Sequence, residues 1–197
     1  MILAPFDELD VLRDKLNGLR LKWNPETKPD ARTVQDVIDD LTYLLVLAYV
    51  FGKDHACEDL DYKLDIDEHQ FQDEMYQTLY MEIDGEDWVK RTTKHMESFD
   101  VEAVMNVAET EMNRDFNQAG INTATLIGKK AGRSVRKTWN TMADDRVRDT
   151  HSYLEGVTEP LDRAFFTYDG DSAMAPGGFT LPQNNCGCRC WLTYSFG

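Results

Sequence analysis

Apolar side chains recur every three or four residues through the first two-thirds of the chain, and this period constrains the fold most because it fits α-helices. One stripe runs through residues 6–23, and Pro25 ends it. A wider stripe follows, and we expect its helix to begin near Asp30 or Thr33 and to end at Gly52. Since the connection is short, the two helices are expected to pack as an antiparallel hairpin.

Downstream, the same period predicts helices at residues 71–83, 88–96, 101–120 and 122–131. Asp100 suits the N-cap of the third, and Gly120 is expected to close it. β-branched and aromatic residues then predict a short strand around Trp139. Glycine and proline from Thr167 onward predict a long loop before a last strand at 190–194. We therefore expect a predominantly α-helical α+β protein, with an N-terminal helical hairpin or bundle and a small C-terminal module of short strands and long Gly/Pro loops.

The charge of the chain is concentrated at one end. The net charge is -15, but residues 1–120 carry 12 Lys/Arg against 28 Asp/Glu, whereas residues 121–197 carry 9 against 8. An acidic front end argues against a protein that coats DNA along its whole surface, because phosphate binding needs clustered cations. The same acids can simply keep a helical surface solvated. The apolar run 41–51 is too short to span a membrane, and no secretory signal opens the chain, so a soluble, non-exported protein is expected.

Four groups of residues in the second half of the chain occur in a recognisable order. They are Thr110-Glu111 with Arg114, Asn117 and Gly120; Lys137-Thr138-Trp139; the segment from Asp144 to His151 with Leu154-Glu155-Gly156; and Asn185-Cys186-Gly187-Cys188-Arg189-Cys190. In order and spacing they resemble the phage Mu F-like head-morphogenesis family over about residues 100–197. Two departures are an inserted Cys-Gly in the terminal motif and Glu109 where the family usually has arginine. We divide the chain into an acidic helical region, 1–97, and a Mu F-like domain, 98–197.

The resemblance implies a phage minor head protein that acts in head morphogenesis. It implies association with the portal and capsid proteins and a place in the virion, at the capsid interior or portal vertex, after synthesis in the host cytoplasm. Packaged DNA is a further partner on this reading. The alternative is a phage-derived toxin or effector module. The residues expected to build the family's structural motif are Trp139, Asp145, Arg146, Arg148 and Gly156.

Three cysteines, Cys186, Cys188 and Cys190, are spaced so that an extended strand would point all three sulfurs to one side. A disulfide between residues two apart would be strained, and no oxidising compartment is indicated. One hypothesis is a structural zinc ion bound by two or three of these cysteines and the histidine of the family segment, His151. The other is a set of reduced, packed thiols. His55, His69 and His95 have no partner at ligand spacing, so surface or helix-end positions are expected for them.

A basic window, free of acids, comprises Lys129, Lys130, Arg133, Arg136 and Lys137. One interpretation is a solvated face that balances the acidic half of the chain. The functional interpretation is contact with packaged DNA or with an acidic rim of the portal, since phosphate contacts need Lys and Arg.

Catalytic readings find little support in the sequence. Glu109 and Glu111 resemble the paired glutamates of ADP-ribosyltransferases, but they lie within an expected helix, where residues two apart diverge by about 200°. A nucleophilic pair of His151 and Cys188 lacks a third group to orient it. No nucleophile elbow, zinc-protease motif, phosphate loop or dinucleotide fingerprint is present. We therefore expect a protein that is not an enzyme.

Overall fold

The computed structural model describes residues 14–18, 20–22, 27–83 and 85–197. The expected first helix and Pro25 therefore lie largely outside the described residues, although 14–18 and 20–22 are helical. Leu16, on the described part, is buried in the main hydrophobic cluster.

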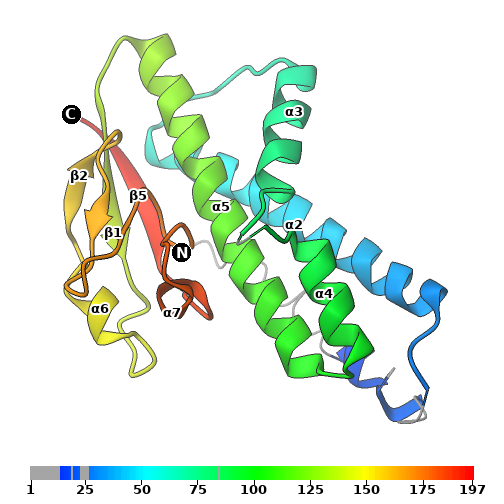
Figure 1. Ribbon diagram of the computed structural model, residues 1–197. Helices are drawn as coiled ribbons and strands as arrows, with labels where there is room; N and C mark the ends of the chain where they lie inside the picture. Colours follow the sequence, from blue (N-terminus) through cyan, green and yellow to red (C-terminus); the bar gives the residue numbers. More distant parts are fainter. Residues whose placement is uncertain (1–13, 19, 23–26, 84) are drawn as a thin grey trace.

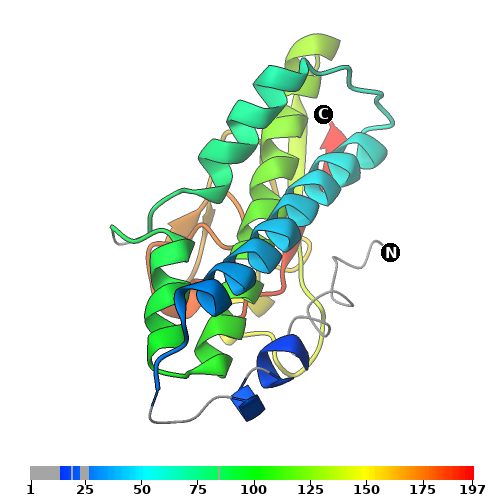
Figure 2. The same cartoon turned by 90° about the vertical axis from the view of Figure 1, so that its right-hand side faces the viewer.

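Two long helices organise the chain and lie side by side (Figures 1 and 2). Helix α2 spans Ala31–Asp59, and the side chain of its N-cap Asp30 accepts a hydrogen bond from a first-turn amide. Helix α5 spans Val101–Ala131, and the expected N-cap Asp100 does the same there. Such caps satisfy amides that have no partner within the helix. Helix α5 ends at Gly132, whose φ of 63° is a left-handed conformation that suits glycine.

Both long helices run through the glycines at which the sequence predicted that they would end, so these two predictions are wrong. A Cβ atom on Gly52 of α2 would lie 2.0 Å from the backbone oxygen of Phe116 in α5. A Cβ atom on Gly120 of α5 would lie 2.5 Å from the hydroxyl of Tyr194. Glycine stands at both positions because another part of the chain approaches closely, and in neither does it break the helix.

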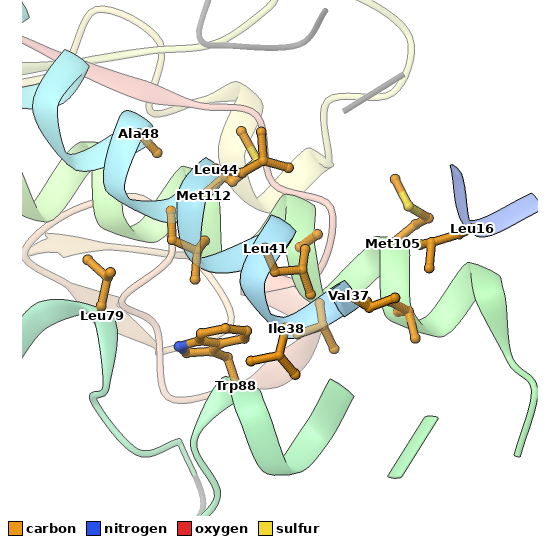
Figure 3. Packing of buried hydrophobic residues seen from close by; sticks show 14 of the residues in the cluster. Leu16, Val37, Ile38, Leu41, Leu44, Ala48, Leu79, Trp88, Met105 and Met112 are labelled. Carbon is orange, nitrogen blue, oxygen red and sulfur yellow. The ribbon is translucent and has the colours of Figure 1, made fainter. Parts of the chain in front are cut away.

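Helices α3, Glu68–Leu79, and α4, Trp88–Glu97, complete the helical part. Both were predicted, but α3 begins and ends three to four residues earlier than the expected 71–83. Each begins at an aspartate cap, Asp67 or Asp87. Together with α2 and α5 they enclose the main hydrophobic cluster, and Figure 3 shows part of it at close range. Residues that meet there include Ile38, Leu41, Leu79, Trp88, Met105 and Met112. This cluster joins helices from both sides of residue 97; the domain division at that point remains a prediction.

Residues 133–197, the C-terminal module, contain a three-stranded antiparallel sheet in the order β2-β1-β5. Its strands are β1, Val135–Asn140, β2, Thr158–Pro160, and β5, Trp191–Phe196. Smaller elements lie in the connections: α6, Asp149–Ser152; β3, Phe165–Phe166; β4, Ser172–Ala173; and α7, Pro182–Asn185. The expected strands around Trp139 and after Cys190 are both confirmed.

Helix α5 lies between the two parts of the protein (Figure 1). It contacts α2, α3 and α4, and it also contacts β1 and β5. A second hydrophobic cluster fills the space between the sheet, α5 and the end of α2, with Ile127, Trp139 and Leu192 fully buried. The expected fold class, α+β and predominantly helical, is confirmed. Within the described ranges, none of the helices is both long and apolar enough to cross a membrane.

Candidate metal centre

Three buried side chains converge inside the C-terminal module. His151 comes from α6, and Cys188 and Cys190 come from the segment that leads into β5. The sulfur of Cys188 lies 3.6 Å from Nδ1 of His151, and the sulfur of Cys190 lies 3.7 Å from the same nitrogen. All three potential ligand atoms lie within 4.8 Å of one another. A group of one imidazole and two thiols at this separation can hold a metal ion.

Cys186 does not join this group among the described residues, although the sequence predicted it as a ligand. It is the C-cap of α7 and is exposed. Gly187 follows with a φ of 64°, a turn conformation that ends the alternation of an extended strand. The sulfurs of Cys188 and Cys190, two residues apart, both reach His151.

Aromatic rings surround the imidazole and exclude water from one side of it. Phe179 stacks on His151 with ring centroids 5.2 Å apart, and Trp139 meets it edge-on at 5.6 Å. Phe165 packs against Trp139 in turn. Trp139, which the family resemblance singled out, is therefore the hydrophobic wall of the cluster. Gly156, from the same motif, donates its N–H to the backbone oxygen of Trp139 at 2.9 Å and has a φ of 73°.

The two thiols share protons with each other and with the histidine. A hydrogen bond from Cys190, with a further one from His151, holds the pKa of the Cys188 thiol well below its usual range. The same interaction with Cys188, together with burial, raises the pKa of Cys190. One thiol of the pair therefore ionises more easily than a free cysteine and the second less easily, as expected for coupled groups.

A hydrogen-bonded loop fixes the chain that precedes the cysteines. Partial burial disfavours the charge of Asp171, but hydrogen bonds from Leu181, Thr180 and Asn184 outweigh it and hold its pKa well below the usual range. Asn185 forms a reciprocal pair with the backbone of Phe179, at 2.9 and 2.6 Å. These contacts set the direction from which the cysteine segment reaches His151.

Side chains from the two long helices close the outer edge of β5. The amide of Asn117 donates to the backbone oxygen of Cys190 and accepts from the N–H of Leu192. His55 lies 2.9 Å from the oxygen of Leu192, and the carboxylate of Asp59 accepts from the N–H of Tyr194. An unpaired strand edge would otherwise expose these groups.

This role of His55 corrects the sequence analysis, which found no partner for it. Besides its contact with β5, the imidazole lies 3.4 Å from Asp59, one helical turn away. A signal was present in the sequence, because His and Asp four residues apart share a helix face. His69 lies exposed in the first turn of α3, and His95 lies in the last turn of α4, as predicted.

The charged side chains before His151 contact the cysteine segment near the end of the chain more than they contact one another. Asp144, and not the motif residue Asp145, forms a two-oxygen ion pair with Arg189, at 2.7 and 2.8 Å. Arg148 donates to the backbone oxygen of Cys186. Arg146 is exposed and its backbone N–H binds Asp144. This segment thus ties α6 to the cysteine segment.

The basic window is divided by the fold. Lys129, Lys130, Arg133 and Arg136, which we call the basic face, are exposed at the end of α5 and the start of β1. Lys137 is not part of this face. It is fully buried, and its Nζ donates to the backbone oxygen of Met174 at 2.7 Å and lies 5.2 Å from the centre of the Phe165 ring. The alternation of a β-strand explains why neighbours at 136 and 137 point to opposite sides.

We expect Lys137→Met to change how stability depends on pH. Burial lowers the pKa of Lys137 to about 8. Between that value and its unfolded pKa of roughly 10.4 the unfolded chain binds more protons, so stability rises with pH. Between pH 7.5 and 10, the free energy of unfolding of the wild type should therefore rise by about 1–2 kcal/mol relative to that of the variant. Urea denaturation across this range measures it, with Lys129→Met as the exposed control; parallel profiles for wild type and Lys137→Met would refute the assignment.

The paired glutamates, Glu109 and Glu111, have different surroundings. Helix α5 turns them to different faces, and Glu111 is fully buried, 2.7 Å from Arg91 and 2.6 Å from Arg114. The pair of His151 and Cys188 is in contact, as a nucleophilic pair requires, but no residue that the structure describes forms a hydrogen bond with Nε2 of the histidine to orient it.

Comparison with known proteins adds to this geometry. The family model described as phage Mu protein F like protein matches residues 69–193, from α3 to β5, which is more than half of the chain. The minor head protein GP7 of Bacillus phage SPP1 is 31% identical over 87 residues, which are 44% of this chain and 28% of that protein. The chain thus spans well under a third of that relative's length. No solved structure matches it. Because this match covers more than half of the chain, including α5, β1 and the group of His151, Cys188 and Cys190, the chain belongs to the phage Mu protein F-like family.

Proposed function

We propose that this protein is a phage minor head protein that acts in head morphogenesis. It is made in the host cytoplasm, associates with the portal and the inner capsid, and is retained in the virion. The observation that carries the proposal is the family match over residues 69–193, because it covers one continuous unit from α3 to β5. The name of the SPP1 relative, a minor head protein, points to the same role. The arrangement of Glu109 and Glu111 gives no support to a toxin or effector enzyme.

The basic face is the proposed contact surface for packaged DNA or an acidic rim of the portal. None of the ion pairs within the described ranges involves its four cations. Lys130 binds the backbone oxygen of Asp65, Arg136 that of Thr158, and Arg133 lies over the ring of Phe196. The charges of these three residues are therefore held by carbonyl or ring contacts and, within the described ranges, have no carboxylate in an ion pair with them, which leaves them available to an anionic partner.

The test is co-purification of the tagged chain with the portal protein of the same phage, at low and at high salt. We expect the portal protein to be retained. The triple change Lys129→Gln, Arg133→Gln and Arg136→Gln should reduce retention most at low salt, because exposed charge pairs are screened by salt. A control that neutralises the exposed Lys90 and Lys94 on α4 should retain the portal as the wild type does. Absence of the portal under all conditions would contradict the proposal.

DNA binding is tested on the same variants by filter retention. If DNA is the partner, the dependence of log affinity on log salt should flatten by about 0.9 for each phosphate that a variant no longer neutralises. No retention by the wild type even at low salt would remove DNA as a partner and leave the portal rim.

A further inference from the structure

We propose that His151, Cys188 and Cys190 bind one zinc ion, and that the fourth ligand of this ion is a water molecule in the adjoining arginine-lined pocket. The site would be a three-ligand N/S centre, buried on one side by aromatic rings and open on the other.

The distances fit a shared metal ion. With Zn–S bonds of about 2.3 Å and a Zn–N bond of about 2.05 Å, tetrahedral geometry places sulfur and nitrogen roughly 3.6 Å apart. The observed separations from Nδ1 of His151 are 3.6 Å to Cys188 and 3.7 Å to Cys190. A single ring nitrogen has either one proton or one lone pair, so it cannot hydrogen-bond fully to two sulfurs at once. One metal ion can satisfy all three atoms.

The chemistry of the ligands selects the metal. Two thiols and an imidazole are soft or borderline ligands, which suit zinc, whereas calcium and magnesium require oxygen ligands. The three residues are 1–3% exposed, and the cluster contains no carboxylate. Two thiolates neutralise the charge of a divalent ion, so a buried site of this composition carries no net charge.

The fourth position opens into a small pocket. His151 and Cys190 contribute to its lining together with Arg146, Arg148 and Arg189. Its cavity volume of about 10 Å³ is at the lower limit of the space that can hold one water molecule. Cys186 is turned away from the group, so a fourth thiolate is not supplied from the same segment.

Such an ion would join two segments that are distant in the sequence. It would tie α6 to the residues that precede β5, and β5 is the strand that carries the module onto α2 and α5. Because the site does not exist in the unfolded chain, zinc binding would stabilise the folded module.

The experiment measures zinc in the full-length protein, purified without chelator, for the wild type and three matched variants. We expect about one zinc per chain in the wild type and in Cys186→Ser. Cys188→Ser and Cys190→Ser each remove a direct ligand. Their affinity for zinc should therefore fall by well over tenfold, which is roughly the cost of losing an outer-sphere partner. Cobalt substitution should give thiolate charge-transfer absorption in the wild type that is unchanged in Cys186→Ser and weakened in the other two. Chelation should lower the Tm of the wild type by several degrees.

Circular dichroism separates loss of metal from loss of fold, because the helices have a hydrophobic cluster of their own and their signal should persist in every variant. The proposal is overturned if the wild type, with its thiols reduced, contains no zinc and gives no cobalt spectrum. It is also overturned if Cys186→Ser loses zinc as completely as Cys188→Ser, or if Cys188 and Cys190 are found as a disulfide.

Discussion

Gly52→Ala is expected to lower the free energy of unfolding by about 3 kcal/mol or more. The added methyl group would lie 2.0 Å from the backbone oxygen of Phe116 and 2.8 Å from its carbonyl carbon. Neither atom can rotate away, because both belong to the backbone of α5. The two longest helices would have to separate, and the packing of the main cluster along their seam would weaken. Urea denaturation followed by circular dichroism measures the change.

The matched control is Gly18→Ala, where a Cβ atom meets nothing within 4 Å and the residue is helical. This change should be neutral or stabilise by up to roughly 1 kcal/mol, which is the difference in helix propensity between the two residues. If the two substitutions had the same effect, close approach of α2 to α5 would not be the reason for glycine at position 52.

Glu111→Gln is expected to destabilise the protein by about 3–5 kcal/mol, because it removes one partner from a buried group of charges. The carboxylate of Glu111 lies between the guanidinium groups of Arg91 and Arg114 inside the helical part. Burial raises the pKa of the neighbouring Asp115 well above its usual range, so this second acid is a poor substitute for the missing charge. The amide would leave Arg91 without its carboxylate partner and Arg114 with Asp115 alone, 3.2 Å away. Thermal and urea unfolding both report the loss.

Glu102→Gln provides the comparison, because it makes the same chemical change on an exposed residue in the first turn of α5. A cost of no more than roughly 1 kcal/mol is expected there, from the weaker interaction with the helix N-terminus. Equal costs at positions 102 and 111 would show that the buried ion pairs contribute nothing beyond the helix itself.

Local signals in the sequence predicted most elements of the fold but not their ends. Asp100 was correctly predicted as a helix cap, and the start of α2 near Asp30 was one of two predicted positions, since a cap depends only on the residues of the first turn. Gly52 and Gly120 were wrongly taken as helix ends. The reason for glycine at each position is a backbone or ring from another element, and no local pattern contains that information.

The site was predicted in part for the same reason. The period of two in an extended strand correctly brought Cys188 and Cys190 to one side, but it failed at Cys186, where Gly187 turns the chain. The sequence placed Lys137 in a basic window but did not show that its side chain points inward. The direction of this side chain depends on which face of β1 meets the second cluster. Closure of the β5 edge by His55, Asp59 and Asn117 joins segments more than 70 residues apart, and no local pattern in the sequence pairs them.

The central claim, that this chain is a component of the phage head, is tested most directly by mass spectrometry of purified virions and of the empty heads from the same lysate. The account predicts peptides of this chain, from both its helical part and its C-terminal module, in particles that also contain the portal protein. Particles that contain the portal protein but none of these peptides, in both filled and empty heads, would contradict it.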